Sequence, residues 1–123
     1  SSDIYSESIK SVYAIEKNMN DYVLTGTDNG CYITLLEDGS FTDNPDNKLQ
    51  IANGFTVYDI FYDKSNDLLI LSCGNSGVLV YDWTGNNLTE YVRAYSSYAY
   101  SARMKDDLLI VGTKNGLELF NLE

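Results

Sequence analysis

The sequence contains no histidine, one proline and two cysteines among its 123 residues. Without histidine there is no Ser-His-Asp triad, no histidine acid–base chemistry and no histidine-ligated metal. Basic residues are also few, eight Lys and Arg against 18 Asp and Glu, and the net charge is −10. Because affinity for nucleic acids comes mainly from Lys and Arg, no nucleic-acid partner is expected. No apolar run approaches the roughly 20 residues of a membrane span.

Hydrophobic residues make up 44% of the chain, and 11 residues are tyrosine. This is the composition of a globular protein with a core of its own, within the size range of one domain. Two cysteines cannot form a disulfide framework or a structural zinc site. Cys31 and Cys73 are expected to be buried free thiols, the alternative being a single disulfide between them, and no cofactor is expected.

Three segments of the chain share one pattern, in which an apolar stretch is followed by an Asp, a β-branched run and a turn glycine. From Val12 to Gly30, Val57 to Gly77 and Tyr98 to Gly116 the spacing is 18, 20 and 18 positions. Another apolar stretch follows each glycine. Repetition at this length indicates a repeat architecture, in which each unit buries its apolar surface against its neighbours.

The runs within each unit are short, β-branched and aromatic, and Gly, Asn and Asp bound them, which favours strands. Asn29-Gly30 and Asn115-Gly116 predict two-residue type I′ hairpins with both residues at positive φ. No window has a helical period, so no helix of note is expected. The outer strand is predicted at Phe41-Thr42 in the first unit and from Leu88 in the second.

The predicted fold is all-β, with three four-stranded antiparallel blades of a β-propeller. Residues 1–123 form a single unit, with blade 1 at about 11–50, blade 2 at about 56–95, and blade 3 at about 97–123 together with strand 3–9. That N-terminal strand is expected to complete the last blade of a ring, because Gly116 to Ile4, read across the joined termini, spans 11 positions. Gly77 to Leu88 and Gly30 to Phe41 span the same number.

Three stretches resemble known propeller repeats. Leu109–Asn121 and Tyr22–Gly30 resemble the repeats of two-component-regulator sensor propellers, and Leu69–Asp82 is similar to the LVIVD-type repeat of bacterial surface proteins. Both resemblances imply an interaction or sensing module and not a catalyst, and they suggest an extracytoplasmic or cell-surface location without fixing the compartment. Neither resemblance assigns functional residues position by position.

Closed propellers have at least four blades, whereas this chain encodes three. Two copies could close a six-bladed ring through terminal strand exchange, the chain could be an excerpt of a longer propeller, or the units could join head to tail as an open polymer. The homodimer is the preferred hypothesis. Its predicted seam comprises Ile4, Tyr5, Ile9, Leu117, Leu119 and Phe120.

The predicted function is that of a non-catalytic scaffold or binding module for a protein or glycan. Tyrosine offers an apolar ring with a polar tip, which suits both kinds of partner. The candidate binding residues lie in or near the loops that join successive blades: Tyr13, Tyr58, Tyr95, Tyr98 and Tyr100. The alternative is a glycan-active enzyme with paired carboxylates on the channel face. Asp43–Asn47 is rich in oxygen ligands but lacks the spacing of a calcium loop, so we expect no metal. The acids fall mostly in predicted turns, so we expect no catalytic residue.

Overall fold

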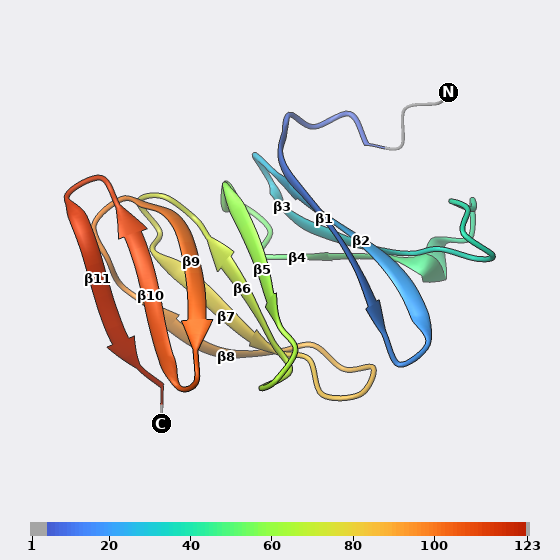
Figure 1. The fold of residues 1–123 in the computed structure, drawn as a ribbon. Helices are drawn as coiled ribbons and strands as arrows, with labels where there is room; N and C mark the ends of the chain where they lie inside the picture. The colour runs from blue at the N-terminus through green and yellow to red at the C-terminus, as the bar shows by residue number, and fades with distance from the viewer. Residues whose placement is uncertain (1–4, 123) are drawn as a thin grey trace.

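The computed structural model describes residues 5–122 and forms three antiparallel sheets that stand in a row (Figure 1). No α-helix occurs in this part of the chain; a single 3₁₀ turn, η1, covers Pro45–Asn47. No helix of the described chain is long and apolar enough to cross a membrane. The all-β prediction is confirmed, and the strands form three separate sheets.

Each sheet follows the order of the chain, so within a sheet each strand pairs with the next one in sequence. Sheet 1 contains β1 (Ile9–Lys17), β2 (Asn20–Thr27), β3 (Gly30–Leu35) and β4 (Lys48–Ile51). Sheet 2 contains β5 (Asp59–Asp63), β6 (Leu68–Ser72), β7 (Val78–Asp82) and β8 (Thr89–Ala94). Sheet 3 contains β9 (Ala99–Lys105), β10 (Leu108–Thr113) and β11 (Gly116–Asn121).

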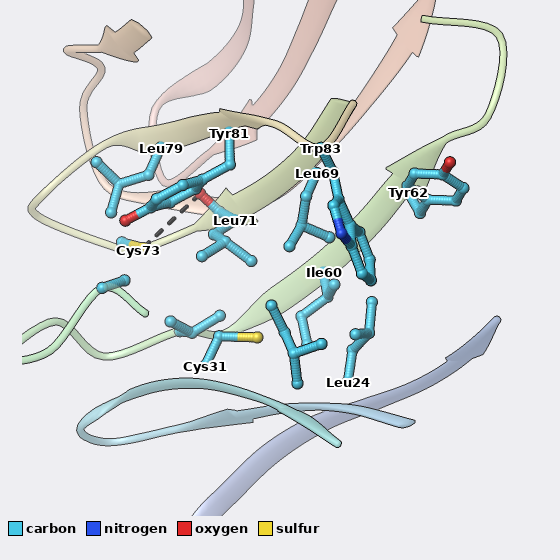
Figure 2. Close-up of a cluster of buried hydrophobic side chains, with 13 residues drawn as sticks. Leu24, Cys31, Ile60, Tyr62, Leu69, Leu71, Cys73, Leu79, Tyr81 and Trp83 are labelled. Atoms are coloured by element: carbon cyan, nitrogen blue, oxygen red, sulfur yellow. Dashed lines mark hydrogen bonds between the residues drawn. The ribbon is translucent and has the colours of Figure 1, made fainter. Parts of the chain in front are cut away.

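Sheet 2 lies between the other two and is covered on both faces. Successive side chains of a strand point to opposite faces, so its largely apolar strands β6 and β7 supply two cores at once. One core, shown in Figure 2, joins sheets 1 and 2 and includes Leu24, Ile60, Leu71 and Trp83. The other core joins sheets 2 and 3 through Ile70, Val80, Leu109 and Val111. The continuous apolar runs are therefore strands, as predicted.

The outer strand of sheet 1 is not where the sequence pattern placed it. Phe41 and Thr42 lie outside any strand, and β4 begins only at Lys48, with Ile51 opposite Cys31. A turn closed by Glu37 and Ser40 and the 3₁₀ turn η1 take up the intervening residues. The spacing of 11 positions from Gly30 therefore does not mark the outer strand of this unit.

The hairpins predicted at Asn29-Gly30 and Asn115-Gly116 are present, but their geometry differs from type I′. Thr27 pairs with Gly30, so Asp28 and Asn29 are the two central residues, and of the three only Gly30 has a positive φ, +91°. The Thr27 hydroxyl accepts a bond from the Asn29 amide and donates to the Gly30 carbonyl, which holds the turn without left-handed central residues. Two successive positive φ values occur instead at Asn18 and Met19, between β1 and β2.

Candidate functional site

Three of the five predicted binding tyrosines gather where sheets 2 and 3 meet. Tyr58 precedes β5, Tyr98 precedes β9 and Tyr100 is the second residue of β9. The rings of Tyr58 and Tyr98 have centroids 5.7 Å apart, and those of Tyr98 and Tyr100 are 5.2 Å apart. We call these three residues the tyrosine cluster. Tyr100 remains 50% exposed, so the cluster presents a ring to solvent.

A hydrogen bond of 2.5 Å joins the hydroxyls of Tyr58 and Tyr98. This bond, more than burial or neighbouring charge, raises the pKa of Tyr98 above its ordinary value. The Tyr98 hydroxyl is therefore protonated at neutral pH. The tyrosine cluster combines aromatic faces with hydroxyls that can donate or accept, which is a surface suited to polar ligands.

Gly74 lies beneath the tyrosine cluster and leaves room for it. Its backbone amide and carbonyl bond those of Ala99, at 2.9 and 3.0 Å, and tie the β6–β7 hairpin to the start of β9. A Cβ atom here would lie 2.8 Å from the Tyr58 ring and 2.9 Å from the Tyr98 ring, and φ is +56°. Glycine is thus required on both steric and conformational grounds. The sequence pattern treated this residue only as part of a turn.

The other two predicted tyrosines lie apart from the tyrosine cluster. Tyr13 packs against the core between sheets 1 and 2. Tyr95 is highly exposed, and the Arg93 guanidinium lies 4.6 Å from its ring centroid and 5.3 Å from that of Phe55. Arg93 was not among the predicted residues. Arg93 lies on β8, and its contact with Phe55, in the connection between β4 and β5, joins residues far apart in the chain, which local sequence does not indicate.

Equivalent backbone bonds show that the three units repeat in three dimensions. The carbonyls of Asp21, Asp67 and Asp107, each just before the apolar run of its second strand, accept bonds of 2.8–2.9 Å. The donors are the amides of Leu36, Trp83 and Leu122, respectively. These three acids therefore hold corresponding places at one end of the three sheets.

Residues 5–8 occupy, on sheet 1, the place that the loop from β8 to β9 occupies on sheet 3. The Asp28 amide bonds the Ser8 carbonyl just as the Lys114 amide bonds the Tyr98 carbonyl, at 3.2 and 2.8 Å. In the same way, Tyr32 donates to Glu7 while Ser97 donates to Glu118. The segment thus lies where a loop arriving from the outer strand of a preceding sheet would lie.

The predicted seam residues are divided by the structure. Ile4 lies outside the described residues. Tyr5 stacks on Tyr32 of the chain's own β3, with ring centroids 4.0 Å apart, and Ile9 pairs with Thr27 in β1. Phe120 packs into the core between sheets 2 and 3. Leu117 and Leu119 alternate with it, and they are 69% and 58% exposed on the opposite face.

Each end sheet has an outer face that no other sheet of residues 5–122 covers, although on sheet 1 Tyr5 lies over part of that face and bonds the buried Thr34. On sheet 3 this face carries Leu117, Leu119 and their cross-strand neighbour Ile110. On sheet 1 it carries Val12, which is 66% exposed, and Val23, beside the Tyr5–Tyr32 stack. The outer edge of β11 also has no neighbouring strand among residues 5–122.

Each sheet has a glycine at the start of its third strand or just before it, and the surroundings of this glycine show whether a fourth strand is present. A Cβ on Gly30 would lie 2.4 Å from the Ile51 carbonyl oxygen, and one on Gly77 would lie 2.3 Å from that of Ala94. Both oxygens belong to the end of the fourth strand. At Gly116 no atom of residues 5–122 lies within 4 Å of the same point. The space that a fourth strand fills in sheets 1 and 2 is therefore not filled beside β11 by the part of the chain that the structure describes.

A partly buried ion pair joins sheets 1 and 2. The Lys17 ammonium lies 3.1 Å from Asp67. The Lys17 side chain is only 4% exposed, beside the rings of Tyr62 and Trp83, whereas that of Asp67 is 39% exposed. The pKa of Asp67 is lowered, chiefly because the Tyr62 hydroxyl donates to it, and Lys17 adds to the effect. The pair carries charge across a joint that is otherwise apolar.

Within residues 5–122 no three His, Cys, Asp or Glu side chains lie close enough to hold a metal ion. In the oxygen-rich loop at Asp43–Asn47, the Asn44 side chain accepts a hydrogen bond from the backbone amide of Asp46. The side-chain amide of Asn47 donates to Glu37 and to Thr42. Cys31 and Cys73 are buried free thiols, as predicted, and burial raises the pKa of each to about 12. Neither is a thiolate at neutral pH.

Comparison with known proteins finds no matching family model and no match among curated proteins. Among solved structures, the chain is similar to the one titled "Crystal structure of the computationally designed Ika4 protein". The TM-score is 0.50 and the sequence identity 17%, over 100% of this chain and 96% of that one. The likeness concerns the fold alone and spans all three sheets.

Proposed function

We propose that this protein is a non-catalytic binding module built from β-propeller blades, in which a second copy completes a six-bladed ring. The observation that carries the proposal is the pair of outer faces at the two ends of the row, which no other sheet of residues 5–122 covers and which expose Val12, Leu117 and Leu119. Apolar surface exposed on a sheet face is typical of interaction sites. In sheet 2, each face packs against a neighbouring sheet, and we propose that the outer faces of sheets 1 and 3 are covered in the same way.

The open edge of β11 supports the same arrangement. Residues 5–8 follow the course of a loop that arrives from a preceding outer strand, and the space beside Gly116 suits such a strand. In the proposed ring, the N-terminal segment of each copy pairs with β11 of the other. This exchange removes the unpaired edges, which are otherwise a liability for aggregation.

Solution mass tests the assembly directly. Light scattering coupled to size-exclusion chromatography should give twice the chain mass of 13.8 kDa. Leu119→Lys places a charge on the open face of sheet 3 and should give the single-chain mass. Phe41→Lys is the control, because Phe41 is 45% exposed but lies outside the sheets, and this variant should keep the doubled mass. A wild-type chain that is monomeric at high concentration refutes the ring.

The tyrosine cluster is the proposed binding face for a protein or glycan partner. Aromatic rings with fixed hydroxyls bind polar ligands at low entropic cost. The test is a screen of glycans and peptides with the wild type, followed by Tyr100→Ala. Tyr91→Ala is the matched control, because Tyr91 has almost the same exposure, 52%, but lies on β8. Equal loss of binding in both variants, or none in either, excludes the tyrosine cluster as the site.

A further inference from the structure

We infer which surfaces form the joint between the two copies; this inference rests on the proposed ring. The open face of sheet 3 in one copy packs on the open face of sheet 1 in the other. Lys105 then meets the acidic pair formed by Glu16 and Asp21 of that second copy. The occupant of each open face is thus a second copy of this chain.

The acidic pair lies on the open face of sheet 1. Glu16 and Asp21 are directly opposite each other on β1 and β2, and they share a face with Val12 and Val23. Both acids are exposed, and no basic group of residues 5–122 forms an ion pair with either. Like charges directly opposite on a sheet are destabilising, so a cation placed here would relieve a repulsion within the chain.

The joint between sheets 1 and 2 shows what such a cation does. Asp67 corresponds to Asp21, since both carbonyls accept the equivalent backbone bond. Asp67 receives an ion pair from Lys17, which is the last residue of the first strand in the preceding sheet. An acid at this place therefore accepts a cation from the sheet before it.

The joint between sheets 2 and 3 also has polar contacts beside the end of its first strand, β5. Asp63 is the last residue of β5 and is buried. Asn66 donates one bond to the Asp63 carboxylate and another to the carbonyl of Asp106, in the β9–β10 turn of the next sheet. The end of the first strand is thus linked to the following sheet in both joints within the chain.

Lys105 is the last residue of β9 and holds the corresponding place on the open side of sheet 3. It lies opposite Leu108 and is exposed, and no acid of residues 5–122 pairs with it. Stacking sheet 1 of a second copy on this face brings Lys105 to the acidic pair. The complementary charges then set the register of the joint, while Leu117, Leu119 and Val12 provide apolar area.

Charge exchange between two variants tests this assignment. In a ring of the Lys105→Glu variant, the new carboxylate lies against Glu16 and Asp21 at both joints. In a ring of the double variant Glu16→Lys/Asp21→Lys, the two new lysines lie against Lys105 at both joints. Each variant alone should dimerise at least about tenfold more weakly than the wild type, because like charges across an interface are costly. An equimolar mixture should recover wild-type dimerisation as a heterodimer, since every joint then pairs opposite charges. Lys64→Glu, the same change in the β5–β6 turn of sheet 2, should leave dimerisation unchanged.

The outcomes separate the joint from the ring. A monomeric wild type refutes the ring and the joint together. A dimeric wild type whose charge variants dimerise normally, or fail to recover on mixing, refutes the joint alone. A zero-length carbodiimide cross-link provides a test without variants. Isotopically mixed wild-type dimers should give an intermolecular peptide joining Lys105 to Glu16 or Asp21, and dimers that yield only other intermolecular cross-links contradict the joint.

Discussion

Sheets 2 and 3 are built from the same repeat, yet they differ in what surrounds them. Sheet 2 has four strands and neighbours on both faces, and all residues of β6 are buried. Sheet 3 has three strands among the described residues and one covered face, and two of the six residues in β10 are buried. The contrast teaches that an apolar strand in this chain depends on the adjacent sheet for its burial.

The largest expected effect comes from truncating leucines in the two sheets. Leu71→Ala should lower the free energy of unfolding by about 2–5 kcal/mol, because it leaves a cavity in the core of Figure 2. Leu119→Ala should change it by less than about 0.5 kcal/mol in the monomer, because that side chain is exposed. Urea denaturation at dilute protein concentration measures both. A large loss for Leu119→Ala would mean that its face is covered within the chain.

The turn glycines offer a second way to compare the sheets. Gly77→Ala and Gly116→Ala share the cost of a positive φ, of order 1–3 kcal/mol. Gly77→Ala also drives its Cβ into the Ala94 carbonyl, which adds about 1–3 kcal/mol of overpacking. The stability difference between the two variants therefore reports the fourth strand. Equal losses in the monomer would show that the Gly116 site is already occupied.

Asp67 and Asp21 hold equivalent places, so variants of the two compare a joint within the chain with an open face. Asp67→Asn should cost roughly 1–3 kcal/mol, because it leaves the buried Lys17 ammonium without its acid. Asp21→Asn should be nearly neutral in the monomer. Because the folded pKa of Asp67 is lowered, its stabilisation is present above its ordinary pKa of 3.8 and is lost as the pH falls through the folded value. Unfolding between pH 7 and pH 2 should therefore show a smaller acid loss for Asp67→Asn than for the wild type; equal profiles would exclude this contribution.

The smallest effect concerns the tyrosine cluster at the junction of sheets 2 and 3. Tyr58→Phe removes one partner of a partly exposed hydroxyl pair and should cost about 0.5–1.5 kcal/mol. It should also return the pKa of Tyr98 toward its ordinary value, since the bond to Tyr58 is the main cause of the rise. Ultraviolet titration of tyrosine ionisation follows this change. A pKa of Tyr98 that stays raised in Tyr58→Phe would show that the two hydroxyls are not bonded.

The sequence by itself determined the all-β class and the repeat, for local physical reasons. The runs at Leu68–Ser72 and Leu108–Thr113 are too short for helices, and turn residues bound them. The burial of Cys31 and Cys73 was also predicted from composition and confirmed. Three of the predicted tyrosines, Tyr58, Tyr98 and Tyr100, do lie together because they begin strands at the same joint.

Tertiary structure alone decided the features that depend on residues distant in the chain. Pairing with β3 placed the outer strand of sheet 1 at Lys48–Ile51, because the pairing partner and not the spacing sets where that strand forms. Sheet packing sent Tyr13 into a core and left Leu119 exposed, although both are apolar strand residues. Burial of an alternating strand depends on which face meets a neighbour, and that neighbour is chosen by the arrangement of the sheets.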